Sequence, residues 1–188
     1  VIVAKDLIEK VFKSNFVEVK TEKELTFNSI KNIPYFICEN FTGKDILEVK
    51  YNQLWDDAPL PVNNPQNAFR IISGDFVTTD EGTGIVHTAP TFGADDSLAA
   101  KNASPEIPPM LVYNEVKELV PLVDLQGKFL NTLKGIGGKY VKNEYYESGF
   151  APDKSVDVEI AIKLKEQNKA FRVEKYTHSY PNCWRTDK

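Results

Sequence analysis

Cysteine is scarce in this sequence, and long apolar runs are missing from it. Its 188 residues include two cysteines, Cys38 and Cys183. Two are too few for the disulfide framework of a small secreted protein, and they fit a reducing compartment. No apolar run is long enough to span a bilayer, and the sequence carries no signal-peptide pattern. These absences exclude a disulfide-stapled secreted scaffold and a helical membrane protein.

An excess of basic charge is also lacking. The sequence holds 23 Lys and Arg against 27 Asp and Glu, and its net charge is −4, whereas a general nucleic-acid binder is usually basic. The basic residues gather toward one end, because residues 154–188 hold eight Lys and Arg against five Asp and Glu. A face of this segment can meet phosphate groups, although charge alone favours a solvated helix surface.

The sequence does contain enough apolar material for one domain. Hydrophobic residues make up 41% of it and aromatic residues 11%. A chain of this size buries roughly 70% of its unfolded surface, so it needs neither a disulfide nor a metal to fold. The sequence begins with Val1 rather than Met and ends abruptly. We therefore expect residues 1–188 to form a single domain excised from a longer protein.

Short strands dominate the expected secondary structure. Helices are expected at residues 5–12, 95–103 and 155–169, and Ser155 can cap the last of them. Strands are expected at residues 16–20, 35–39, 46–51, 68–73, 75–79, 84–88, 110–113, 119–123 and 171–180. The irregular order of these elements disfavours a doubly wound sheet. It predicts a mainly β fold with some α+β character, a β-barrel or sandwich with peripheral helices.

One segment combines small residues with reactive side chains. Residues 82–90 read Gly-Thr-Gly-Ile-Val-His-Thr-Ala-Pro, and residues 92–96 read Phe-Gly-Ala-Asp-Asp. His87 lies at the end of an expected strand, and Asp95 and Asp96 open the helix that follows. A strand end that faces a helix N-terminus can bind polar groups through the unpaired amides of the helix. Two other readings stay open: His87 as a hydrogen-bonded structural residue, and either Asp as an ordinary N-cap.

The spacing of the residues argues against several other kinds of site. No Gly-Lys-Ser/Thr follows the Gly-Thr-Gly triplet, so it is no phosphate-binding loop. A serine nucleophile elbow is absent. The only histidines are His87 and His178, and the cysteines are not paired as in a zinc site.

Residues 82–96 resemble the editing domain inserted into isoleucyl-tRNA synthetases, members of the class I aminoacyl-tRNA synthetases. Segments at residues 64–79, 127–129, 140–145, 157–164 and 178–186 are similar to the same family, so the resemblance covers nearly the whole chain. It implies a single β-barrel-like editing domain over residues 1–188. Residues 178–188 would form the exit strand toward the aminoacylation core.

The resemblance also implies an activity and roles for residues. Such a domain hydrolyses valine wrongly attached to isoleucine tRNA. Asp96 matches the carboxylate that anchors the α-ammonium group of the substrate. His87 matches a residue that shapes the side-chain pocket near the ester, and whether it also acts as a base stays open. Asp95 corresponds to a cap or a solvated neighbour. The resemblance implies that four further residues form the substrate pocket: Thr83, Gly84, Thr88 and Phe92.

Partners and cofactors follow from the same resemblance. The expected partners are isoleucine tRNA mischarged with valine and the rest of the synthetase chain, in the cytoplasm and without a membrane. No cofactor or metal is expected for this domain, since ATP and Mg²⁺ belong to the separate catalytic domain of the full-length enzyme.

Two departures from the family pattern keep alternatives open. The family places a threonine-rich segment, Thr-Thr-Pro-Trp-Thr-Leu-Pro, before the point where this sequence starts, so we expect the fragment alone to be a weak enzyme. Thr186 replaces the second cysteine of a Cys-Trp-Arg-Cys segment, so the zinc site of some relatives is not expected. One alternative is a non-catalytic tRNA-binding insert in this truncated form. Another is a metal-dependent hydrolase that uses His87, Asp95 and Asp96.

Overall fold

The computed structural model of the chain describes residues 1–174. The expected exit strand at residues 178–188 therefore lies outside the described residues, as do His178, Cys183 and Thr186. The chain divides into two compact units, Val1–Lys139 and Tyr140–Lys188. The motif at residues 82–96 belongs to the first unit.

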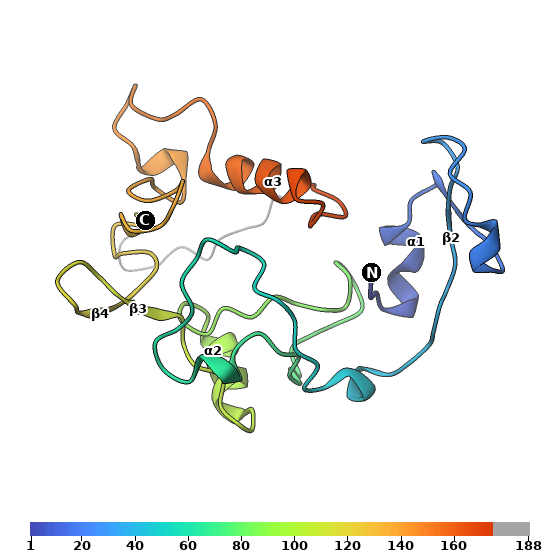
Figure 1. The fold of residues 1–188 in the computed structure, drawn as a ribbon, viewed down its shortest axis with the longest axis horizontal. Coiled ribbons are helices and arrows are strands. Elements are labelled where there is room, and N and C mark those ends of the chain that lie inside the picture. Colours follow the sequence, from blue (N-terminus) through green and yellow to red (C-terminus); the bar gives the residue numbers. More distant parts are fainter. Residues whose placement is uncertain (175–188) are drawn as a thin grey trace. The chain divides into compact units, whose positions relative to one another are not determined.

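Helices and short strands alternate irregularly along the chain (Figure 1). In chain order the elements are η1 (Lys5–Leu7), α1 (Ile8–Val11), β1 (Phe16–Glu18), η2 (Glu22–Glu24), β2 (Ile33–Tyr35), η3 (Gly43–Ile46), η4 (Pro65–Asn67), α2 (Ala94–Asn102), β3 (Leu111–Tyr113), β4 (Leu119–Pro121), η5 (Asn143–Tyr145) and α3 (Val156–Glu166), where η marks a 3₁₀ helix. No helix among residues 1–174 is long and apolar enough to cross a membrane.

The strands form two small sheets. In one, β1 pairs in parallel with β2, and Phe16 lies opposite Ile33. In the other, β3 pairs antiparallel with β4, and Val112 lies opposite Val120. The strands expected at residues 16–20, 110–113 and 119–123 are confirmed, and the one expected at residues 35–39 lies earlier in the chain, at β2.

A third pairing is too short to count as a sheet. Lys50 forms an antiparallel bridge with Arg70. The amide of Tyr51 donates to the carbonyl of Phe69 at 2.8 Å, and the amide of Ile71 donates to that of Val49 at 2.9 Å. We call residues 48–51 and 69–71 the 48–71 ribbon. Of the strands expected at residues 46–51 and 68–73, only this ribbon forms.

For residues 1–174 the expected α+β content is confirmed, but the expected mainly β barrel is wrong. More of them lie in helices than in strands, no barrel closes among them, and the domain is a mixed one with small sheets. Residues 75–79 and 84–88 form no strand, nor do residues 171–174 at the start of the last expected strand. Near the motif, the absence of a strand is explained by the local backbone conformation and by a local side-chain hydrogen bond. Gly82 and Gly84 take left-handed φ angles of 69° and 79°, and Thr83 Oγ1 accepts the amide of Ile85 at 3.3 Å. Such side-chain bonding competes with a strand ladder.

The three predicted helices are confirmed, with small shifts at their ends. Residues 5–11 form η1 followed directly by α1, and α2 begins one residue earlier than expected. Ser155 is the N-cap residue of α3, but its side chain makes no capping hydrogen bond. The first turns of α2 and α3 are acidic and their last turns basic, which suits the helix dipole.

The core of the first unit is small and includes one charged residue. Leu7 is fully buried in η1, and Ala100 is 2% exposed on the inner side of α2. Arg70 is the buried charged residue of the described chain, and its side chain is 2% exposed. A guanidinium can lie so deep only where acceptors surround it. Its acceptors tie the 48–71 ribbon to the segment that follows α2.

Candidate functional site

Asp96 lies in the first turn of α2, and its carboxylate folds back onto the loop before the helix. Asp96 Oδ2 accepts the backbone amide of Ala89 at 3.0 Å in a half-buried position. The carbonyl of Ala89 in turn accepts the amides of Phe92 and Gly93, both at 3.1 Å. Both polar groups of Ala89 are therefore paired, and the loop at residues 89–93 closes tightly against the helix start. The prediction that Asp96 lies near a helix N-terminus is confirmed.

Gly93 makes room for this carboxylate. It is the N-cap of α2 with φ −87° and ψ 133°, an ordinary extended conformation that any residue adopts. A Cβ atom at position 93 would lie 2.5 Å from Asp96 Oδ2 and 2.9 Å from its Cγ. Glycine at position 93 thus leaves the space in which the Asp96 carboxylate lies, and its backbone freedom is not needed there.

The second oxygen of Asp96 stays available. Among residues 1–174 the side chain makes its one hydrogen bond through Oδ2, and Oδ1 has no partner there. The positive end of the α2 dipole favours an anion at this position. One oxygen is therefore held by the protein while the other can accept a hydrogen bond from a bound cation.

Thr91 links this loop to the segment that leaves α2. Its Oγ1 accepts the amide of Met110 at 2.9 Å, and the amide of Ile107 donates to the carbonyl of Ala100 at 3.0 Å. The chain therefore returns along α2 and is tied to both ends of it. Thr91 was not among the predicted site residues, because a lone threonine in a loop carries no signal for a contact nineteen residues away.

His87 lies on the surface. It is exposed, in a stretch without regular structure, and makes no hydrogen bond within the described part of the chain. The strand end predicted for it is therefore wrong. The ligand site predicted between His87 and the N-terminus of α2 stays a prediction. Two shallow hollows, one over α3 and one around residues 114–116 and 130–132, include none of the predicted site residues.

Thr83 and Gly84 contact the N-terminal segment. The amide of Ala4 donates to the carbonyl of Thr83 at 2.8 Å. A Cβ atom on Gly84 would lie 2.5 Å from Cβ of Ala4. Lys10 Nζ also donates to the carbonyl of Asp80 at 2.7 Å. Residues 4–10 thus cover one side of the motif, and the role of Thr83 and Gly84 in binding substrate stays a prediction.

The remaining predicted residues lie in or directly beside the loop at residues 89–93. Thr88 is half-buried, Asp95 is exposed, and Phe92 is 64% exposed. Their roles also stay predictions. Among residues 1–174 no three or more side chains of His, Cys, Asp or Glu are grouped to hold a metal ion.

The close approach of Ala4 and Gly84 gives a testable expectation. Gly84→Ala should destabilise the 188-residue chain by about 2–4 kcal/mol, because it adds a clash with Ala4 to the strain of a left-handed alanine. Gly82→Ala is the matched control, since Gly82 has a similar φ but nothing within 4 Å of its added Cβ. It should cost only about 1–2 kcal/mol, the strain alone. Urea unfolding measures both, and equal losses would contradict the Ala4 contact.

The comparisons with known proteins point to one kind of protein. No family model matches the chain. It is 43% identical to the isoleucine--tRNA ligase of Cytophaga hutchinsonii and 40% identical to that of Bacteroides fragilis, in both cases over 100% of its length. It is 36% identical to the isoleucine--tRNA ligase of Clostridium tetani over 92% of its length. The chain spans 15–17% of the length of these relatives. The predicted resemblance to this synthetase family is confirmed.

Proposed function

We propose that this chain, which matches a segment of isoleucine--tRNA ligases over its full length, hydrolyses valine that has been wrongly joined to isoleucine tRNA. The bond cut is the ester between valine and the terminal ribose of the tRNA. The longer protein would be an ATP-dependent isoleucine-tRNA ligase of the cytoplasm. The partners of this segment would be the mischarged tRNA and the rest of that ligase.

A ligase for isoleucine needs such a second reaction. An apolar pocket separates two substrates that differ by one methylene by only about 10–200-fold, a limit for which isoleucyl-tRNA synthetase is the usual example. A hydrolytic site can exclude the larger isoleucine by size and admit valine. The two sites together then give the selectivity that one pocket cannot reach.

The observation that carries the proposal is the held carboxylate of Asp96. An aminoacyl ester carries an α-ammonium group, and a fixed carboxylate both orients such a group and selects for it. Asp96 Oδ2 is held by the amide of Ala89, and Oδ1 remains to bind the ammonium. The bound ester carbonyl would then face a water molecule, and holding both in place lowers the barrier to attack. We propose no metal or other cofactor for this step.

His87 has a separate role in this proposal. An imidazole beside the substrate side chain would leave room for valine and not for isoleucine. Such discrimination rests on a clash and not on an added attraction. The exposure of His87 in the structure gives the ring access to a bound ligand.

Truncating His87 should therefore change selectivity more than rate. We expect His87→Ala in the full-length ligase to hydrolyse isoleucyl-tRNA about 10-fold or more faster than the parent, because one methylene of space is worth about that factor. Valyl-tRNA hydrolysis should stay within a few-fold of the parent. Deacylation of the two charged tRNAs measures this, and unchanged rejection of isoleucyl-tRNA would remove His87 from the pocket.

The function itself is tested with the full-length ligase. The parent enzyme should release valine from valyl-tRNA much faster than isoleucine from isoleucyl-tRNA. Deletion of residues 1–188 from the ligase should abolish this hydrolysis. A deletion variant that still clears valyl-tRNA at the parent rate would show that the reaction takes place elsewhere.

A further inference from the structure

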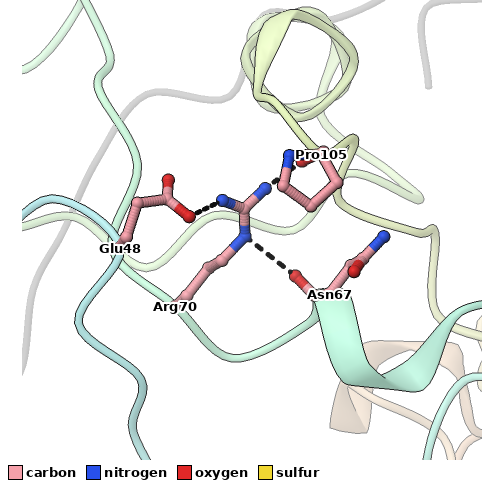
Figure 2. A network of polar contacts seen from close by, with 4 residues as sticks. All are labelled: Glu48, Asn67, Arg70 and Pro105. Atoms are coloured by element: carbon pink, nitrogen blue, oxygen red, sulfur yellow. Dashed lines mark hydrogen bonds and ion pairs between the residues drawn. The ribbon is translucent and has the colours of Figure 1, made fainter.

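Arg70 is the one charged side chain buried in the described part of the first unit, and the proposed reaction does not use it directly. Figure 2 shows its guanidinium between three acceptors. Nε donates to the carbonyl of Asn67 at 3.1 Å, Nη1 pairs with the carboxylate of Glu48, and Nη2 donates to the carbonyl of Pro105. Three separate chain segments therefore meet at one side chain.

The bond to Pro105 reaches the segment that fixes α2. Pro105 lies three residues after the last residue of the helix, Asn102. Beyond it, the amide of Ile107 donates to the carbonyl of Ala100, and the amide of Met110 donates to Oγ1 of Thr91. Residues 105–110 are thus held by Arg70 at one end and tied to the loop before α2 at the other.

That loop is the one that holds the carboxylate of Asp96. Thr91 lies between Ala89, which donates to Asp96 Oδ2, and Gly93, over which the carboxylate lies. A shift of residues 105–110 would therefore be passed through Thr91 to the partner of Asp96. The contacts form a continuous physical path from the 48–71 ribbon to the candidate anchor.

We infer that Arg70 is a positioning residue for the ammonium-binding carboxylate of Asp96, an inference that rests on the proposed function. Its planar guanidinium can reach three acceptors in fixed directions at once. A lysine keeps the charge but cannot reproduce that arrangement. Arg70→Lys should therefore loosen residues 105–110 while leaving a cation in the same place.

A substrate analogue separates positioning from a merely structural role. α-Hydroxyisovaleryl-tRNA carries a hydroxyl in place of the α-ammonium of valyl-tRNA and is otherwise the same ester. If Arg70 acts through Asp96, its loss affects the substrate with the ammonium and spares the analogue. A residue that only stabilises the fold would lower both rates together, in proportion to the folded fraction.

The experiment uses the full-length ligase and measures kcat/KM for both esters, together with aminoacylation and circular dichroism. Arg70→Lys should hydrolyse valyl-tRNA about 10–100-fold more slowly, since a displacement of about 1 Å can cost 100-fold. The kcat/KM for the analogue should change by less than about 3-fold. The ratio of kcat/KM for valyl-tRNA to kcat/KM for the analogue should therefore fall. Asp96→Asn should lower the same ratio at least as far. Arg172→Lys is the matched control. Arg172 is also an ion-paired arginine, but it and its partner Glu174 belong to the second unit and to none of the contacts that connect Arg70 with Asp96.

Glu48→Gln keeps the test valid if Arg70→Lys does not fold. The Glu48 side chain is 56% exposed, and glutamine keeps a carbonyl oxygen that can accept from Nη1 of Arg70, yet Arg70 loses its countercharge. The ratio should fall in this variant too, by a smaller factor. The inference alone would be overturned if folded Arg70→Lys enzyme kept the parent ratio while Asp96→Asn enzyme showed the fall. If Arg70→Lys does not fold, Glu48→Gln enzyme with the parent ratio would overturn it in the same way. A parent enzyme that does not hydrolyse valyl-tRNA would overturn the proposed function and this inference with it.

Discussion

Asp96→Ala in the full-length ligase is expected to reduce valyl-tRNA hydrolysis about 100-fold or more and to leave aminoacylation unchanged. The substitution removes the charged partner of the α-ammonium group. A charge-assisted hydrogen bond is worth about 1.5–3 kcal/mol, and misplacement of the ester adds to that loss. Single-turnover deacylation of valyl-tRNA and steady-state charging with isoleucine measure the two activities on one preparation.

Two further variants separate charge from structure. Asp96→Asn keeps an oxygen to accept the amide of Ala89, so the loop before α2 should hold its shape while the charge is lost. It should therefore be nearly as inactive as Asp96→Ala. Asp95→Asn is the matched control, because Asp95 is the exposed neighbour in the same helical turn. If Asp95→Asn loses as much hydrolysis as Asp96→Asn, the effect comes from helix charge and the ammonium-anchor role is wrong.

Gly93→Ala should impair the same reaction without touching any charged group. The added methyl would need the space that Asp96 Oδ2 occupies, so the carboxylate must move by an ångström or so. We expect about a 100-fold loss of valyl-tRNA hydrolysis. The free energy of unfolding should fall by only about 1 kcal/mol, because alanine adopts the N-cap conformation but caps less well than glycine.

Gly43→Ala is the control for this prediction. Gly43 begins the 3₁₀ helix η3, and an added Cβ there would meet nothing within 4 Å. Its hydrolysis rate should equal that of the parent. Parent-like hydrolysis by Gly93→Ala would mean that the carboxylate need not lie where the structure has it.

Helices of this chain were readable from sequence because their signals are local. Acidic residues after Gly93 and the proline at position 105 mark the two ends of α2. The same kind of signal marks α3, where Ser155 precedes an apolar repeat. A strand depends on pairing with another segment, and the local sequence pattern does not identify that segment. Residues 84–88 alternate in a strand-like way, but left-handed turns at Gly82 and Gly84 leave them unpaired.

The candidate site was predictable in its side chains and not in its contacts. Placing Asp96 at the start of a helix needed only the motif. Its partner is a backbone amide of Ala89, and the contact of Ala4 with Thr83 joins two segments of the unit that are far apart in sequence, so no local pattern predicts either contact. Arg70 did leave a trace, since it is a lone charge between Phe69 and Ile71. No sequence pattern identifies the backbone carbonyls that accept its hydrogen bonds.

The contacts between the N-terminal segment and the motif also bear on the order of folding. Lys10 and Asp80 are 70 positions apart in the sequence, and Ala4 and Thr83 are separated by a similar span. Closing a loop of this length carries an entropic cost of about 4 kcal/mol from its length alone, which no local bond repays until both ends have docked. Helix α2 closes through near neighbours and can form early. The loop at residues 80–84 would then be among the last parts to become ordered, after the helix that bears Asp96.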